Sequence, residues 1–261
     1  MTRIATWNVN SVKARLANVT GWIAETRPEI VLLQEIKCET DAFPRAAFEE
    51  LGYHAAVVGQ KSYNGVALLS TLPVSDVLDR LPGEPEDPQA RYVEATVGGL
   101  RVASLYLPNG NPVGTEKYPY KLRWMDRLHE RARALLAEEV PFVLGGDYNV
   151  IPAPEDVYDP VGWTEDALFR LDTRRQFRKL LNLGLTEAFR ALHPQERHAY
   201  TFWDYQAGAW PRDNGLRIDH FLLSPGAADR LVSCTIDRGP RGREKASDHT
   251  PVIVELADPV S

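Results

Sequence analysis

The apolar positions of this chain fall into short runs, and each run stops at a polar residue able to bind a metal or a phosphate. Such short, β-rich runs are typical of buried strands in layered α/β proteins, where ligands gather in the loops after strand ends. The runs and their stops are residues 4–7 before Asn8, 30–33 before Gln34-Glu35, 102–105 before Tyr106, and 141–144 before Gly145-Gly146-Asp147-Tyr148-Asn149. Two further strands are expected at 218–223 and 252–256, with Asp219 and Asp248-His249 at or near their starts.

Helical periodicity alternates with these strands. One apolar face is expected over residues 12–23, ending near Arg27-Pro28, a second over 125–136, and a third over 177–181 before Gly184. Residues 92–97 and 101–107 flank Gly98-Gly99, a pattern that predicts a hairpin with its turn at the two glycines. The Pro-rich segment 82–88 is expected to be an exposed loop. The hairpin excludes a simple βαβ repeat.

The order of elements predicts an α/β fold with two packed sheets and helices outside. A TIM barrel stays open on periodicity alone. The pieces of the expected site span positions 8 to 249, so we expect one domain over residues 1–261.

Composition places the chain among ordinary globular enzymes. It has 261 residues, of which 44% are hydrophobic and 25% charged, and this argues against disorder. No run approaches the about 18 apolar residues of a membrane span, and no signal-peptide region opens the chain, so a cytoplasmic location is expected. Cys38 and Cys234 are expected to be reduced.

The formal net charge of −6 does not indicate nucleic-acid binding, but basic residues are locally dense in two places. For the first group, a solvated helix face and a phosphate-binding face both stay open. The second group comes just before Asp248-His249, which favours phosphate contact. The groups are Arg170, Arg174, Arg175, Arg178 and Lys179, and then Arg238, Arg241, Arg243 and Lys245.

The polar residues that follow the apolar runs have the chemistry of a metal-assisted phosphodiester hydrolase. Carboxylates at Glu35 and Asp248 could hold a hard divalent ion; magnesium is expected, with manganese as the alternative. The chain has no HExxH motif and no Cys/His cluster of zinc spacing, which argues against the usual zinc hydrolases.

Two pairs could carry out the proton chemistry. Asp147 could orient or deprotonate water while Asn149 binds phosphate, although the same residues also suit a simple Asx turn. Asp219 could hold His249 as an imidazolium that faces the phosphate, although a histidine after an aspartate also suits a structural role. Their co-occurrence with Asn8 and Glu35 favours catalysis.

Seven motifs, in order over nearly the whole chain, resemble the exodeoxyribonuclease III family of abasic-site endonucleases within the endonuclease/exonuclease/phosphatase superfamily. They are Thr6-Trp7-Asn8-Val9-Asn10, Leu33-Gln34-Glu35-Ile36-Lys37, Tyr106-Leu107-Pro108-Asn109-Gly110, Gly146-Asp147-Tyr148-Asn149-Val150, Tyr200-Thr201-Phe202-Trp203, Arg217-Ile218-Asp219-His220 and Ser247-Asp248-His249.

The resemblance implies a four-layer α/β sandwich and a role for each site residue. It implies Glu35 as the principal metal ligand, with Asn8 beside it and Asp248 in direct or water-mediated contact. It further implies that Asp147 orients water, that Asn149 and Tyr106 contact the scissile phosphate, with Asn109 nearby, and that Asp219 orients His249.

By the same resemblance, Phe202, Leu216 and Ile218 form an apolar pocket for a flipped, baseless sugar. Some family members carry tryptophan where this chain has Phe202 or Leu216, so the balance of endonuclease and exonuclease action stays open. Residues expected in loops that grip the DNA backbone are Lys13, Arg15, Lys61, Asn64, Lys117 and Lys121.

We therefore expect a monomer that hydrolyses double-stranded DNA, especially at abasic sites. Incision is expected 5′ to the lesion, with 3′-5′ exonuclease and 3′-phosphatase activity in an undetermined ratio. Two alternatives remain: a superfamily enzyme acting on another substrate, such as a phosphoinositide, sphingomyelin or undamaged DNA, and a non-catalytic nucleic-acid-binding module.

Overall fold

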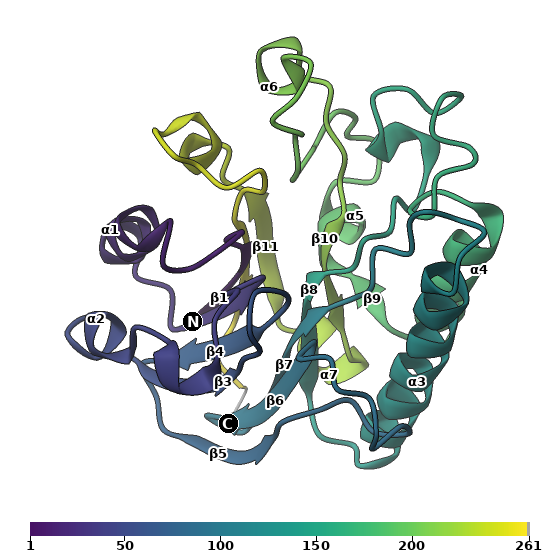
Figure 1. Cartoon of the computed structure of the whole chain (residues 1–261). Coiled ribbons are helices and arrows are strands. Elements are labelled where there is room, and N and C mark those ends of the chain that lie inside the picture. Colours follow the sequence, from purple (N-terminus) through teal and green to yellow (C-terminus); the bar gives the residue numbers. More distant parts are fainter. Residues whose placement is uncertain (260–261) are drawn as a thin grey trace.

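Two six-stranded mixed sheets form the centre of the computed structural model, which describes residues 1–259 (Figure 1). The first sheet contains, in spatial order, β11 (Leu231–Ile236), β12 (Val252–Leu256), β1 (Thr2–Asn8), β2 (Ile30–Gln34), β4 (Val66–Ser70) and β3 (His54–Val58). The second contains β5 (Val74–Leu78), β6 (Tyr92–Val97), β7 (Leu100–Tyr106), β8 (Phe142–Asp147), β10 (Asp219–Leu223) and β9 (Thr186–Glu187).

Each sheet has one parallel pair of strands at its centre. β1 pairs in parallel with β2, and β7 with β8, whereas the other pairs are antiparallel. A parallel pair needs a crossover connection, and here the crossovers contain α1 (Leu16–Thr26) and α3 (Lys117–Ala137). Because parallel strands end at the same sheet edge, these pairs bring Asn8 beside Gln34 and Tyr106 beside Asp147.

The molecule has four layers, helix–sheet–sheet–helix, and Figure 1 shows the helical layers at the left and right. The inner core lies between the sheets and contains Ile4 and Leu32 from one sheet and Val143 and Phe221 from the other. The alternate residues of the same strands face outward and pack against helices.

On the outer side of the first sheet, α1 and α2 (Arg45–Glu49) supply Trp22 and Phe48 to an apolar cluster. On the outer side of the second sheet, α3 and α4 (Leu171–Leu181) supply Leu128 and Phe177. The remaining helices are short: η1 (Thr40–Ala42), η2 (Pro154–Asp156), α5 (Ala188–Leu192), α6 (Ala209–Arg212), α7 (Pro225–Ala228) and η3 (Gly239–Gly242).

This architecture confirms the predicted four-layer sandwich and excludes the barrel. The hairpin around Gly98-Gly99 is present as β6 and β7. The first predicted helix begins at Leu16 rather than at Val12, because residues 9–15 form a turn that carries Asn10 and Ser11 at positive φ. The buried Val12 packs under α1 from that turn.

No helix within residues 1–259 is long and apolar enough to cross a membrane. Cys38 and Cys234 are both free and buried. They belong to different apolar clusters, Cys38 to the outer cluster below α1 and Cys234 to the core between the sheets.

Candidate active site

Strand register brings the predicted site residues together at one end of the sandwich. In the second sheet Tyr106 lies opposite Asp147, and Asp147 lies opposite Asp219. These neighbours face the end of the first sheet, where Asn8 completes β1 and Glu35 follows β2. The site is therefore built from both sheets, and the packing of the sheets fixes the distance between its halves.

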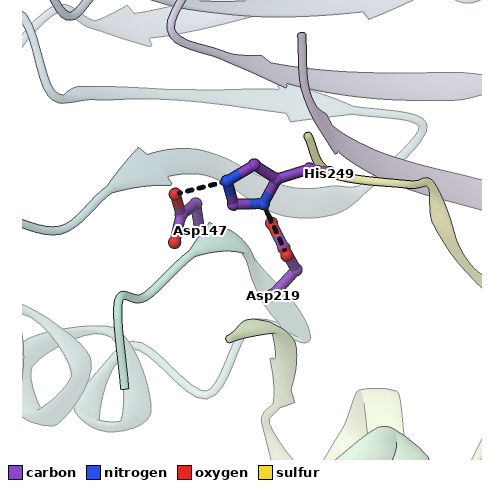
Figure 2. A group of neighbouring side chains, drawn as sticks. All are labelled: Asp147, Asp219 and His249. Atoms are coloured by element: carbon purple, nitrogen blue, oxygen red, sulfur yellow. Dashed lines mark hydrogen bonds and ion pairs between the residues drawn. The ribbon is translucent and has the colours of Figure 1, made fainter. Parts of the chain in front are cut away.

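A buried histidine lies between two buried aspartates (Figure 2). His249 Nδ1 is 2.9 Å from Asp219 Oδ2 and 3.2 Å from Asp219 Oδ1. On the other side of the ring, Nε2 lies 3.6 Å from Asp147 Oδ2, which is too long for a strong hydrogen bond. Asp219 therefore fixes the ring, and Nε2 keeps the capacity to bond elsewhere.

The charges of these three residues are strongly linked. Burial by itself lowers the pKa of His249, but Asp219 and Asp147 outweigh it and raise the pKa to about 10. Burial raises the pKa of Asp147 to about 7, with Asp219 adding to the effect and His249 opposing it. His249 is thus an imidazolium at neutral pH, and Asp147 can gain or lose a proton there.

Asn8, Glu35 and Tyr106 connect the two sheets. Asn8 Nδ2 donates to Glu35 Oε1 at 3.0 Å and to Asp147 Oδ2 at 2.9 Å. The Tyr106 hydroxyl donates to Glu35 Oε1 at 2.8 Å. Burial raises the pKa of Glu35, but the Asn8 hydrogen bond and the nearby Lys37 ammonium outweigh it, so the net shift is downward. Glu35 is therefore held as an anion.

The donor set suits a hard divalent cation. Among residues 1–259, carboxylate oxygens of Asp147 and Asp219 lie within 4.8 Å of the His249 ring, which as an imidazolium offers no metal ligand itself. Glu35 adds an ionised carboxylate, which shares the donor Asn8 with Asp147. Buried, oxygen-rich groups of this kind are the usual ligands of magnesium and manganese.

The three predicted metal ligands are arranged differently from one another. Asn8 turns its amide nitrogen toward the carboxylates, and its Oδ1 accepts from the Asn10 backbone N–H at 3.0 Å, so the amide oxygen is already engaged. Asp248 Oδ1 accepts from Asn10 Nδ2 at 3.2 Å. In this arrangement Glu35 and Asp248 offer oxygen ligands, and Asn8 acts as a hydrogen-bond donor that orients Glu35.

Asn149 and Asn109 lie on the second-sheet side of the site. Asn149 adopts positive φ two residues after the end of β8, and its Nδ2 donates to Leu107 O at 2.9 Å. Asn109 Nδ2 in turn donates to Asn149 Oδ1 at 3.2 Å. The Asx turn considered from the sequence is also present, because Asn149 N donates to Asp147 Oδ1 at 2.9 Å. The turn therefore holds Asn149 beside Asp147, with its amide bonded to Leu107 O and to Asn109.

The prediction that Lys121 lies in a loop and grips DNA was wrong. Lys121 is fully buried on α3, and its Nζ donates to Pro108 O at 2.9 Å and to Asn149 O at 2.7 Å. Helical spacing was visible in the sequence around Lys121, but we expected its long, charged side chain to face solvent. Lys117, the first residue of α3, is exposed.

Phe202, Leu216 and Ile218 belong to one apolar cluster, and of the three Phe202 lies beside the histidine. The Phe202 ring lies 5.0 Å from the His249 ring in an edge-on arrangement, and Phe202 bridges through its backbone to both Leu216 and His249. Leu216 and Ile218 are each 2% exposed, and Phe202 is half-buried. Phe202 therefore forms the accessible wall, and the other two support it from the core.

Several residues that organise the site were not predicted. Thr201 Oγ1 accepts from the backbone N–H groups of Ile218 and Asp219 at 3.1 and 3.2 Å, which fixes the start of β10. Lys37 Nζ bonds Asn10 Oδ1 at 2.5 Å and lies 2.9 Å from Glu35 Oε2. Asn10, Lys37 and Thr201 all belong to the recognised motifs, so their motif membership was the available signal.

The two basic groups have different surroundings. In the first, Arg170, Arg175 and Lys179 pair with Glu165, Asp172 and Asp126, which favours a solvated helix face. In the second, Arg241, Arg243 and Lys245 line a pocket together with Arg15. Asn64, expected to contact DNA, is 9% exposed and is bonded to Gln60 at 2.9 Å.

A four-layer sandwich with carboxylates, amides and one imidazolium at the meeting strand ends defines the class of DNase I-like phosphohydrolases. The chain belongs to the Endonuclease/Exonuclease/phosphatase family, which matches residues 5–249.

Relatives cover nearly the whole chain. Exodeoxyribonuclease III of Haemophilus influenzae is 31% identical over 265 residues, which cover 97% of this chain and 99% of the relative. The structure of an AP endonuclease from Archaeoglobus fulgidus is 40% identical with a TM-score of 0.94, and covers 98% of this chain and 99% of its own.

The 3′-5′ exonuclease NExo from Neisseria meningitidis is 42% identical with a TM-score of 0.95, covering 98% of this chain and 100% of its own. A second structure describes NExo from Neisseria as a 3′ phosphatase bound to a product DNA hairpin. These findings confirm the resemblance to the exodeoxyribonuclease III family. The family is one of metal-dependent nucleases.

Proposed function

We propose that this chain is a magnesium-dependent DNA-repair phosphodiesterase that cuts duplex DNA 5′ to an abasic site. The observation that carries the proposal is the buried Asp147–His249–Asp219 group held beside the ionised Glu35. The relatives support DNA as substrate, since they are described as an AP endonuclease, a 3′-5′ exonuclease and a 3′ phosphatase bound to a DNA hairpin.

In the proposed mechanism His249 is the hydrogen-bond donor to the phosphate, and Asp147 is the proton acceptor. The His249 imidazolium, held through Nδ1 by Asp219, donates from Nε2 to a non-bridging phosphate oxygen. Asp147, with its pKa of about 7, accepts a proton from the attacking water. The 3.6 Å separation of the two facing atoms means that substrate need not displace a strong hydrogen bond between them.

The other predicted residues bind and orient the phosphate. Tyr106 and Asn149 flank Asp147, and Asn109 bonds Asn149, so these groups can contact the phosphate oxygens. Glu35 and Asp248 would hold magnesium, with manganese as a substitute. When bound, the cation would neutralise phosphate charge and stabilise the leaving 3′ oxygen. The departing 3′ oxygen would take a proton from solvent water, so incision would leave a 3′-hydroxyl.

Abasic specificity is assigned to the apolar wall beside His249. A baseless sugar can pack against the half-buried Phe202 ring, 5.0 Å from the ring that faces its phosphate. A nucleotide that carries a base needs more room than Phe202, backed by Leu216 and Ile218, leaves.

We further propose a monomeric, cytoplasmic protein whose whole chain is one domain.

The test is incision of an end-labelled duplex that contains one synthetic abasic site, with magnesium, with manganese or with chelator. Nicking 5′ to the lesion, loss of nicking in chelator, and a product that a polymerase extends are expected. Glu35→Gln is the matched variant, because it removes only the charge, and it should lose most activity at low magnesium. A 3′ unsaturated aldehyde product would instead show lyase chemistry and overturn the proposal.

A second candidate activity is hydrolysis at a 3′ end. It is favoured by NExo, which is 42% identical and is described as a 3′-5′ exonuclease and, in a DNA-bound structure 41% identical to this chain, as a 3′ phosphatase. The same assay with a recessed 3′ end and with a 3′-phosphate end compares the three rates. Rates at 3′ ends far above the abasic rate would make end processing the main activity.

A further inference from the structure

A fully buried lysine bonds the two loops that carry the candidate phosphate-binding amides. Lys121 lies on the same buried stripe of α3 as Tyr118 and Trp124, each three positions away, so helical spacing turns it toward the protein. Its Nζ donates to Pro108 O at 2.9 Å and to Asn149 O at 2.7 Å. Pro108 follows β7 and Asn149 follows β8, so one side chain joins both loops.

The two bonded carbonyls belong to the backbone that orients the amides. Pro108 immediately precedes Asn109, and Asn149 is bonded to Lys121 through its own carbonyl. The loops are also joined through side chains, because Asn109 Nδ2 donates to Asn149 Oδ1 at 3.2 Å and Asn149 Nδ2 donates to Leu107 O at 2.9 Å. The amides and the lysine therefore hold one junction between the loops.

The loop after β7 packs directly on the stem of Lys121. Gly110 adopts a φ of +91°, and a Cβ at this position would lie 2.7 Å from Lys121 Cδ and 3.1 Å from Ala167 Cβ. Positive φ is readily adopted by glycine, and the close approach leaves no room for a larger residue. The backbone that follows Asn109 is thus fitted to the lysine, so a shift of this side chain would shift the loop.

The burial of Lys121 is offset by the two carbonyls. Within residues 1–259 this lysine forms no ion pair, and burial lowers its pKa to about 7, although Asp147 and Asp166 oppose the shift. A buried polar group is costly unless it is hydrogen-bonded. The ammonium has three N–H donors and the neutral amine has two, so both carbonyls can be bonded in either charge state. An apolar side chain here would leave both carbonyls without this donor.

We propose that Lys121 is a positioning residue that fixes the spacing of Asn109 and Asn149 for the scissile phosphate. The inference rests on the proposed function, which assigns these amides to the phosphate. Lys121 acts only through the two loops and needs no contact with DNA. Groups that meet a transition state must be held to within about 0.5 Å, so loss of the donor should lower the rate of the chemical step more than the affinity for DNA.

The test compares Lys121→Met with wild type in single-turnover incision at saturating enzyme and in DNA binding by fluorescence anisotropy in chelator. Methionine keeps a flexible apolar stem and removes the donor. The rate should fall by about tenfold to a hundredfold, whereas Kd should stay nearly unchanged. The control is Lys179→Met, which removes an exposed amine from α4 and should change neither quantity. An unchanged rate in Lys121→Met, or equal losses of rate and affinity, would overturn the proposal.

A double-mutant cycle with Asn149→Ala separates positioning from general destabilisation. If Lys121 acts through this amide, adding Lys121→Met to Asn149→Ala should cost much less rate than it does in wild type, because the positioned group is already absent. Losses that multiply in full would contradict a positioning role. If the methionine variant does not fold, Lys121→Gln takes its place in every measurement, since it keeps a donor on a side chain one bond shorter.

Hydrogen exchange of the Asn109 and Asn149 side-chain amides reports on the loop junction without any reaction. In protein labelled with ¹⁵N-asparagine, Lys121→Met should speed the exchange of both amides, whereas Lys179→Met should not. If wild type nicks no DNA but the variants show this difference, the junction stands and the proposed function fails. Exchange that is unchanged in Lys121→Met would refute the positioning role, whatever the activity.

Discussion

Strand β10 and the two residues before it connect two buried charged clusters that differ in how their charges are paired. Toward the space between the sheets, Asp219 faces His249 and Asp147. Two residues earlier, Arg217 lies between Asp156 and Glu187, at 2.7 and 2.9 Å. Both clusters are almost completely excluded from solvent. Burial is thus common to both, and the difference lies in how fully the charges are paired.

The Arg217 cluster is fully paired. Arg217 donates to both carboxylates, and Arg190 adds a second guanidinium 2.7 Å from Asp156 Oδ1. Burial raises the pKa of Glu187, but Arg217 and His220 outweigh it and lower the pKa to about 2. Glu187 therefore keeps one charge state across the physiological range. That is the behaviour of a structural ion cluster.

The Asp147 cluster is incompletely paired. One imidazolium faces two carboxylates, and the pKa of Asp147 is raised to about 7 by its burial and by Asp219. A group that titrates near neutrality can exchange a proton with water during a reaction. Full pairing therefore indicates a structural cluster in this molecule, and incomplete pairing indicates a reactive one.

The largest effect should follow from breaking the reactive cluster. His249→Asn and Asp219→Asn should each reduce the rate of incision by about 10²- to 10⁴-fold, because the phosphate loses its positioned donor. The double variant should lose little more, since partners acting as a unit are non-additive. Single-turnover rates on abasic duplex measure this. Losses that multiply would show that the two residues act independently.

Breaking the structural cluster should affect stability instead of rate. Arg217→Met leaves Asp156 and Glu187 buried and uncompensated, so we expect a loss of about 3–5 kcal/mol. For a chain of this size, that lowers Tm by roughly 10 °C. Thermal unfolding provides the measurement, and Glu187→Gln is the milder matched variant. If Arg217→Met keeps the wild-type Tm but loses incision activity below its Tm, then the cluster belongs to the active site.

The pH dependence of the incision rate should follow the Asp147 cluster and not the Arg217 cluster. The rate should rise with pH through about 7 as Asp147 ionises, and fall only near pH 10 as His249 loses its proton. Asp147→Asn should remove the lower transition along with most activity. A lower transition that persists in the residual activity of Asp147→Asn would assign it to another group.

Stability should follow the same two groups. The pKa of His249 is raised from 6.5, so its contribution is full below about 6.5 and is lost as pH rises through about 10. The pKa of Asp147 is also raised, so its contribution is present below about 3.8 and is lost as pH rises through about 7. Unfolding in chelator between pH 7 and 10 should show a decline that His249→Asn flattens.

Much of this fold could be predicted from the sequence, because apolar runs mark strands buried on both faces. β1, β2, β8 and β10 were found in this way, and β12 was found although only its alternate residues are buried. β3, β4, β5 and β11 were not predicted. β5 was hidden because three of its five residues, at 75–77, are exposed. β4 is wholly buried and was simply passed over.

The candidate site was predictable to the extent that each residue lies at or near one end of a strand. Tyr106, Asp147 and Asp219 come together because of register, which a single sequence does not determine. Lys121 shows the limit most clearly. Its burial depends on two backbone carbonyls, of Pro108 and Asn149, that no side-chain pattern reveals. The orientation of the Asn8 amide likewise depends on the backbone of Asn10.

The smallest expected effect concerns the apolar wall beside the reactive cluster. Phe202→Ala should lower the ratio of nicking rates on abasic and intact duplexes by roughly tenfold, since an apolar contact contributes about 1–3 kcal/mol to discrimination. Magnesium dependence should stay the same, because the ring supplies packing and no ligand. The matched control is Leu216→Ala, which removes a side chain that is only 2% exposed. This variant should lower Tm and leave the ratio of nicking rates nearly unchanged. An unchanged ratio in Phe202→Ala would remove abasic specificity from this wall and favour the broader activity on DNA ends.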